Sequence, residues 1–279
     1  MFPPYLTIPA QDLGKGTPVQ VRILGDMSSL GRDLAEALKL EILAAHREKR
    51  GATFIIPVGP VDQYPLLARM LNEERISCRD VVFIGMDEYL DDRDVWLPPD
   101  HPLSFRGYLN RMFYDQLDPV VAPPPENRVF PDPQDISLVP KLVAARGGVD
   151  ACYGGIGITG HIAFNEPPPS DAPMSVEAFA ALPTRVLTLT CETRTINSVT
   201  VGGEISIIPR RAVTVGMKEI LGARRLRLYC NRPWQSSVAR RVLHGPITAS
   251  CPASLMRLHP DATLTVADYV ATPPNIKLR

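Results

Sequence analysis

Apolar residues follow two alternating patterns along the chain. Unbroken apolar runs, such as residues 81–84, are typical of strands buried on both faces of a parallel sheet. Apolar residues spaced by four, at Leu30, Leu34, Leu38 and Ile42, predict a helix that packs one face on such a sheet. Predicted helices cover about 30–42, 64–74, 105–117 and 136–146, and predicted strands cover 19–24, 53–56, 81–84, 149–153, 185–190, 212–215, 226–230 and 263–267.

This alternation predicts an α/β protein with a Rossmann-like three-layer fold, in which helices cover both faces of a mostly parallel sheet. We find no internal repeat, low-complexity tract or linker, so we expect one domain over residues 1–279. Three proline clusters, at 97–102, 119–133 and 167–173, predict stiff loops without helix.

Composition favours a small-molecule enzyme of the cytoplasm. Thirty basic and thirty acidic side chains leave no net charge, so nothing indicates a nucleic-acid partner or an anionic membrane surface. No apolar stretch approaches the roughly 20 residues that span a bilayer, and the N-terminus lacks the features of a signal peptide. The five cysteines are widely scattered, which argues against a disulfide framework and fits a reducing compartment.

A glycine-rich segment, residues 154–167 (GGIGITGHIAFNEP), follows the predicted strand at 149–153. Its glycines allow backbone to approach a ligand closely, and His161, Asn165 and Glu166 follow them. Open α/β sheets place their sites at the carboxyl ends of strands, where this segment lies. A plain connection between a strand and a helix is the alternative, but it would not need the ionisable side chains.

A second candidate segment carries two carboxylates. Asp87 and Glu88 stand where the strand at 81–84 should end. Successive strand side chains point to opposite faces, so we expect only one of the two to enter a given cleft. The alternative interpretations are a solvated acidic turn or a helix cap. Ser104 is placed to cap the helix predicted from residue 105.

These segments together resemble the glucosamine-6-phosphate deaminase/isomerase family, of which the chain looks like a divergent member. The resemblance is carried by MDEY at 86–89, HPLSF at 101–105 and the loop at 155–167, and it extends over about 19–268. It implies that Asp87 is the base at sugar carbon C2, His161 the acid–base that opens the ring, and Glu166 its carboxylate partner. It also implies a substrate-binding set of Gly59, Glu88, Gly157, Gly160, Arg194, Arg232 and Gln235.

The implied reaction is an aldose–ketose isomerisation that releases ammonia from an amino sugar or its phosphate. Histidine can move protons near neutral pH, and a partly desolvated carboxylate suits abstraction from C2. We expect no cofactor and no metal, because the chemistry needs neither and no cluster of ligands is evident. The expected partner is the small-molecule substrate, and a homo-oligomer remains open.

Three departures from the family pattern concern the site. Thr159 stands where an acidic residue or its amide is usual, and a neutral hydrogen bond there should cost about 1–2 kcal/mol, or about 5- to 30-fold in rate. The phosphate loop, residues 57–62, lacks two hydroxyls and gains Asp62. Gln235 replaces a lysine, so Arg194, with Arg232 nearby, is expected to be the main phosphate ligand. These changes predict weak or relocated phosphate recognition.

Two further hypotheses stay open at this point. The chain could be a sugar-binding or sensor protein that kept the fold and lost turnover, as the altered phosphate loop and Thr159 would allow. It could also be a hydrolase similar to the phosphogluconolactonases, which use the same histidine loop without a base at C2. In the resembling enzymes a mobile lid follows this loop, and here it would cover about 168–192.

Overall fold

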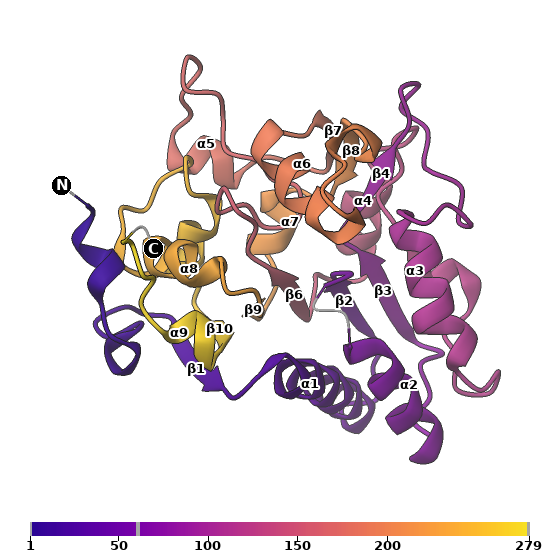
Figure 1. Ribbon diagram of the computed structural model, residues 1–279. Helices are drawn as coiled ribbons and strands as arrows, with labels where there is room; N and C mark the ends of the chain where they lie inside the picture. The colour runs from indigo at the N-terminus through magenta and orange to yellow at the C-terminus, as the bar shows by residue number, and fades with distance from the viewer. Residues whose placement is uncertain (1, 60–61, 278–279) are drawn as a thin grey trace.

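The computed structural model describes residues 2–59 and 62–277 and contains a seven-stranded sheet in which each neighbouring pair of strands is parallel (Figure 1). The predicted mostly parallel α/β sheet is therefore confirmed. The strands lie in the order β1 (Gln20–Leu24), β10 (Ala262–Ala267), β9 (Leu226–Cys230), β6 (Ala151–Gly155), β2 (Ala52–Ile56), β3 (Val81–Gly85) and β5 (Arg128–Val129).

Helices cover both faces of this sheet, as predicted. In Figure 1, α1 (Met27–Arg47) and α2 (Gln63–Glu73) lie below the strands, and α7 (Met217–Leu221) and α8 (Gln235–His244) lie above them. The first helix begins at Asp26, whose carboxylate accepts a hydrogen bond from the Ser29 amide. The remaining helices are α3 (Phe105–Met112), α4 (Leu138–Ala145), α5 (Val176–Ala180), α6 (Cys191–Ser198) and α9 (Asp268–Ala271).

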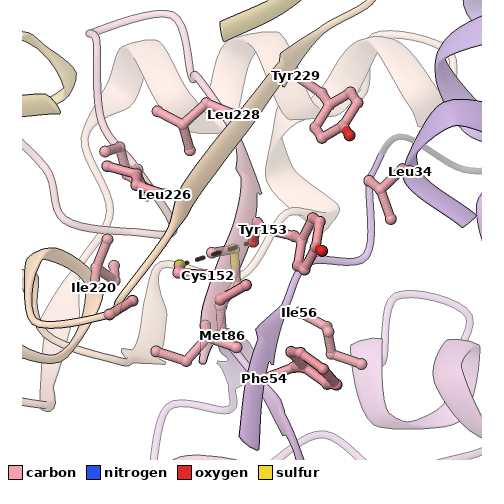
Figure 2. Close-up of a cluster of buried hydrophobic side chains, with 14 of the residues drawn as sticks. Leu34, Phe54, Ile56, Met86, Cys152, Tyr153, Ile220, Leu226, Leu228 and Tyr229 are labelled. Atoms are coloured by element: carbon pink, nitrogen blue, oxygen red, sulfur yellow. Dashed lines mark hydrogen bonds between the residues drawn. The ribbon is translucent and has the colours of Figure 1, made fainter. Parts of the chain in front are cut away.

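The apolar core lies between the central strands and these helices. Figure 2 shows Phe54 of β2, Tyr153 of β6 and Leu228 of β9 within one cluster, and all three are fully or almost fully buried. Every residue of β2 and β3 is buried, which explains why their sequences do not alternate. The rigid centre of the sheet fixes the strand ends that carry the candidate site.

A second sheet differs from the prediction. Residues 185–190 and 212–215 were expected in the mostly parallel sheet, but β7 (Arg185–Thr188) and β8 (Arg211–Thr214) instead pair antiparallel with each other. On its other side β8 pairs antiparallel with β4 (Asp87–Leu90), a strand that the sequence analysis did not separate from β3. Met86 joins the two sheets, since its amide donates to Ile56 O in one and its carbonyl accepts from Val215 N in the other.

Helix boundaries also differ from the prediction: the helix expected over 30–42 extends over Met27–Arg47. The helix expected over 105–117 ends at Met112, and a short 3-10 turn, Tyr114–Gln116, follows it. Its predicted beginning is confirmed, because the Ser104 hydroxyl accepts a hydrogen bond from the Gly107 amide. Among the helices within 2–59 and 62–277, none has both the length and the apolar character required to cross a bilayer.

The two faces of α1 provide a matched test of the core. Leu38 is fully buried, whereas Leu40 on the same helix is 56% exposed. Leu38→Ala should lower the free energy of unfolding by about 2–5 kcal/mol, because it leaves a cavity in a close-packed interior. Leu40→Ala should change it by less than about 0.5 kcal/mol. Urea unfolding of both variants measures this, and equal effects would contradict the assigned core face.

Candidate active site

A cleft of about 380 Å³ opens at the carboxyl ends of β2, β6 and β9 and beside the start of β4. Asp87 and His161 both line it, so the two separate motifs found in the sequence meet at one site. This is the edge at which parallel α/β sheets gather their functional loops. Much of the remaining wall is aromatic and comes from Tyr89, Phe105, Tyr108, Phe164 and Trp234.

The carboxylates of Asp87 and Glu88 point in different directions, as strand alternation predicts. Asp87 faces the cleft, while Glu88 is fully buried and accepts hydrogen bonds from the Ser104 hydroxyl at 3.0 Å and from the amides of Phe105 and Arg106 at 3.0 and 2.8 Å. We therefore assign Glu88 to the start of α3, which corrects its expected place among substrate ligands.

Burial dominates the electrostatics of Asp87. Removal from water raises the pKa of its carboxyl well above the ordinary value, and the nearby charge of Glu88 raises that pKa further. Because ionisation is disfavoured in this position, the carboxylate is a stronger base than an exposed aspartate.

The imidazole of His161 is held through Nδ1. Thr159 Oγ1 lies 2.9 Å from this nitrogen, and Glu166 Oε2 lies 3.2 Å from it. The Thr159 hydroxyl donates its single proton to Glu166 Oε2, at 3.1 Å, so Thr159 accepts a hydrogen bond from the ring. The proton of neutral His161 therefore resides on Nδ1, and Nε2 keeps its lone pair.

Glu166 lies behind the histidine, where it supplies the negative charge that Thr159 lacks. Burial alone would raise the pKa of Glu166, but the hydrogen bond and the charge of His161 outweigh that effect and lower the pKa to about 2. Its other oxygen, Oε1, accepts hydrogen bonds from the amide and the hydroxyl of Thr190. Position 159 thus carries the neutral Thr159, and Glu166 is the carboxylate that lies beside the imidazole ring.

Two loop glycines, Gly157 and Gly160, leave space for the side chains that pack against them. A Cβ on Gly157 would lie 1.8 Å from His161 Nε2, so only glycine leaves space for the ring. Gly160 has a φ of +87°, and a Cβ there would meet Cys251 Sγ at 2.7 Å. Gly157 lines the cleft, whereas Gly160 does not.

The expected phosphate ligands fall into two groups. Gly59, Arg232 and Gln235 line the cleft. Arg194 does not: its guanidinium donates to the backbone carbonyls of Ile208 at 3.2 Å and Ile205 at 2.9 Å. Arg194 therefore braces the segment after α6 in this structure, contrary to its expected role. Residues 60 and 61 of the expected phosphate loop lie outside the described residues, and Asp62 is exposed at the start of α2.

The cover of the cleft comes from a later segment than the expected lid. No residue of 168–192 lines the cleft, although that segment contains α5 and β7. Ile196, Asn197, Thr200 and Ile208 do line it, and they belong to α6 and the turns that follow. Asn197 also donates a hydrogen bond to the Tyr89 hydroxyl at 2.9 Å, which ties α6 to β4.

Sequence inspection missed several residues of the cleft. Asn231 follows the end of β9, and Trp234 stands just before α8. The position of Asn231 at a strand end was a usable signal, because that edge carries the site in this fold class. Over residues 2–59 and 62–277, no group of three or more His, Cys, Asp or Glu side chains is arranged to hold a metal ion.

The packing of Gly157 against His161 gives a direct test of this geometry. Gly157→Ala should displace the imidazole and reduce any turnover that depends on it by about 100-fold, the scale expected for a misplaced reacting group. Gly25→Ala is the control, because a Cβ there meets no atom within 4 Å. Steady-state kinetics with circular dichroism would check this, and an unimpaired Gly157→Ala variant would show that the ring need not occupy its observed position.

Comparison with known proteins places this geometry in a family. The chain is 33% identical over 261 residues to the glucosamine-6-phosphate deaminase of Streptomyces avermitilis, covering 91% of this chain and 92% of that protein. The corresponding protein of Cronobacter sakazakii is 32% identical over 223 residues, or 78% of this chain and 77% of its own. No protein-family model matches the chain.

Solved structures agree with these sequence relations. A monomeric glucosamine-6-phosphate deaminase superimposes with a TM-score of 0.76 at 27% identity, covering 91% of this chain and 99% of its own. The 6-phosphogluconolactonase of Trypanosoma cruzi shares the fold, with a TM-score of 0.61 at 16% identity over 91% of this chain and 96% of its own. By sequence and by structure, the chain belongs to the glucosamine-6-phosphate deaminase family.

Proposed function

We propose that this protein is an enzyme that isomerises an amino sugar, in the manner of the glucosamine-6-phosphate deaminases it resembles, and releases ammonia from it. The observation that carries the proposal is that the buried carboxylate of Asp87 and the oriented imidazole of His161 line one cleft. A binding protein would have no need of a carboxylate whose pKa is raised or of a ring whose proton is fixed on one nitrogen.

Ring opening is the task that suits His161. With Nδ1 held by Thr159 and Glu166, the lone pair of Nε2 can take the proton of the anomeric hydroxyl and return it to the ring oxygen. The cation formed in between is stabilised by the adjacent Glu166 carboxylate, whose pKa of about 2 keeps it ionised at any physiological pH. This charge offsets the loss of an acidic residue at position 159.

Asp87 suits the isomerisation itself. Its carboxylate would take the proton from C2 of the open-chain sugar, whose C–H electron pair forms the C1–C2 double bond while the C1=O π pair moves to the oxygen and takes a proton from the ammonium group at C2. The same carboxyl then returns its proton to C1 as the nitrogen lone pair forms a double bond to C2. The nitrogen at C2 is then an imine, which water converts to a ketone with release of ammonia. The sum is amino sugar plus water to ketose plus ammonia. Burial favours this role, because it makes the carboxylate more basic.

We also propose a cytoplasmic location for the reaction and a small sugar as its substrate. All five cysteines are free thiols, which is compatible with a reducing cytoplasm. The substrate is a small amino sugar or its phosphate, as the name of the relatives indicates for them. We assign the movable cover to the segment 196–208, since its residues rather than those of 168–192 contact the cleft. Incubation with glucosamine 6-phosphate, followed by assays of ammonia and of the ketose product, tests the function directly.

Asp87→Asn should remove turnover and spare binding. The amide preserves the shape of the side chain but cannot accept the C2 proton, so kcat should fall by about 10²- to 10⁴-fold while substrate affinity changes little. Asp92→Asn, an identical change at an exposed position outside the cleft, is the control. Ammonia release and calorimetric titration measure the two effects. A variant that kept more than about a tenth of wild-type turnover would contradict the role of Asp87 as the base.

The pH profile should carry the signature of Asp87. Its pKa is raised, so the carboxyl becomes protonated and inactive at a higher pH than an ordinary aspartate, whose pKa is about 3.9. The value of kcat/KM should therefore fall about tenfold per pH unit on an acid limb whose midpoint lies above that value. Glu166 contributes nothing to this limb, because its pKa is about 2. Activity that stayed constant down to about pH 4 would be inconsistent with a buried base.

A further inference from the structure

A buried tyrosine shares the cleft face of β4 with the proposed base. Asp87 and Tyr89 both line the cleft, whereas Glu88 between them points to the start of α3. Residues two apart on a strand lie on the same face, about 7 Å from each other along the strand. The phenol of Tyr89 therefore lies beside the carboxylate of Asp87. Neither ring opening by His161 nor proton transfer by Asp87 uses this phenol.

The ring of Tyr89 is fixed by other aromatic side chains. Its centroid lies 4.8 Å from that of Phe105 and 5.4 Å from that of Phe164, and only 3% of Tyr89 is exposed. Such contacts restrain a ring through buried area and the geometry of the ring pairs. Because a phenol oxygen lies in the plane of its ring, a fixed ring also fixes the oxygen. The Tyr89 hydroxyl thus has a defined position in the wall of the cleft.

The proton of the Tyr89 hydroxyl has no acceptor in the described part of the chain. The amide of Asn197, which also lines the cleft, donates to the Tyr89 oxygen at 2.9 Å. Within residues 2–59 and 62–277 the hydroxyl itself donates to no group. A hydroxyl has one proton to donate and two lone pairs that accept. With one lone pair occupied by Asn197, the O–H group is available to a ligand in the cleft.

The surroundings of Tyr89 keep this proton on the oxygen. Burial raises the pKa of Tyr89 above its ordinary value, the hydrogen bond from Asn197 opposes that rise, and the charges of Asp87 and Glu88 add to it. A tyrosine that stays protonated donates hydrogen bonds and does not act as a base. Its natural partner in the cleft is an oxygen that gains negative charge.

Three other hydroxyls of the cleft wall are already engaged. The hydroxyls of Ser104 and Tyr229 donate to the carboxylates of Glu88 and Asp33, each at 3.0 Å. The hydroxyl of Thr200 donates to a backbone carbonyl of α6 at 2.8 Å. None of these three protons is directed to a ligand in the observed arrangement, which distinguishes them from the proton of Tyr89.

Negative charge develops on one substrate oxygen during the proposed reaction. When the carboxylate of Asp87 removes the proton from C2, the C1=O π pair moves to the C1 oxygen. This oxygen is only two bonds from C2, so it lies close to the base. A donor aimed at it stabilises the transition state more than the bound aldehyde, because the charge on the oxygen grows as the proton leaves.

Resting on the proposed function, we propose that Tyr89 is a further catalytic residue: its hydroxyl donates a hydrogen bond to the C1 oxygen of the open-chain sugar while Asp87 takes the proton from C2. The O–H bond of Tyr89 does not break in this role. The C1 oxygen receives its proton from the ammonium group at C2, and Tyr89 holds that oxygen while its charge grows. One strand, β4, thus carries the base and the group that stabilises the charge which the base creates.

Tyr89→Phe keeps the ring and removes only the hydroxyl. With glucosamine 6-phosphate, kcat should fall about 100-fold and KM should change little, because the lost contact is stronger in the transition state than in the bound sugar. Tyr5→Phe makes the same change outside the cleft and should behave as the wild type. Ammonia release measures both variants. A fall in kcat of less than about tenfold in Tyr89→Phe would overturn the proposal.

Asn197→Leu separates the phenol proton from the hydrogen bond that crosses the cleft. This variant also loses the contact between Asn197 and Tyr89, but it leaves the phenol proton in place. Its kcat should fall by about tenfold or less, and by less than that of Tyr89→Phe. If Asn197→Leu loses as much kcat as Tyr89→Phe, or more, the tie between α6 and β4 is what matters, and the proposal is wrong.

Binding measurements separate this proposal from the proposed function. The probes are 2-amino-2-deoxygluconate 6-phosphate, whose C1 carboxylate is anionic, and 2-amino-2-deoxyglucitol 6-phosphate, whose C1 hydroxyl is neutral. Both are titrated calorimetrically into Asp87→Asn and into Asp87→Asn combined with Tyr89→Phe. Adding Tyr89→Phe should weaken binding of the carboxylate at least about tenfold and binding of the alcohol less than about threefold. Retained binding of the alcohol also shows that the double variant is folded.

The two proposals can then fail separately. If the wild type releases no ammonia from glucosamine 6-phosphate but the carboxylate probe alone loses affinity, the proposed function is wrong and the donor at C1 stands. If ammonia is released and the two probes lose affinity equally, or neither loses any, the function stands and the role of Tyr89 is overturned.

Discussion

The imidazole of His161 occupies the space in which any residue other than Gly157 would carry its Cβ, and the rest of the site depends on this packing. Thr159 and Glu166 hold the ring in this position through their contacts with Nδ1. Position and protonation are thus set by one arrangement. The glycine determines where Nε2 lies, and the two hydrogen-bonding groups determine that Nε2 is the nitrogen with the free lone pair.

The Asp87–Glu88 pair shows how strand alternation divides two adjacent carboxylates between two tasks. Glu88 receives hydrogen bonds from the first turn of α3, and Asp87 faces the cleft. This arrangement is possible because the chain leaves the large sheet at Met86, after β3, and continues as β4, which pairs antiparallel with β8 in the second sheet. A residue that would otherwise end a central strand therefore becomes part of the wall of the site.

Local patterns in the sequence predicted most of the elements but less of the detailed contacts. The buried runs at β2, β3 and β9 and the apolar face of α1 depend on short-range periodicity, which a sequence displays directly. The second sheet begins at Met86, where the backbone hydrogen bonds pass from Ile56 of the first sheet to Val215 beside the second. The spacing of apolar residues in the sequence does not indicate this change. Arg194 and Gln235 were expected to contact the ligand, but in the structure both donate hydrogen bonds to backbone carbonyls of other segments. Such contacts become visible only when the segments are brought together in space.

The Glu88 cap also affects the cleft, although Glu88 does not contact it. Its burial raises the pKa of Glu88, and the hydrogen bonds from α3 oppose that rise. The pKa of Glu88 stays above its ordinary value, but these hydrogen bonds favour its ionised form, whose negative charge adds to the burial that raises the pKa of Asp87. The basicity of Asp87 therefore depends on a helix cap in the layer behind it, so the stability of α3 and the proton affinity of the cleft are linked through two neighbouring side chains.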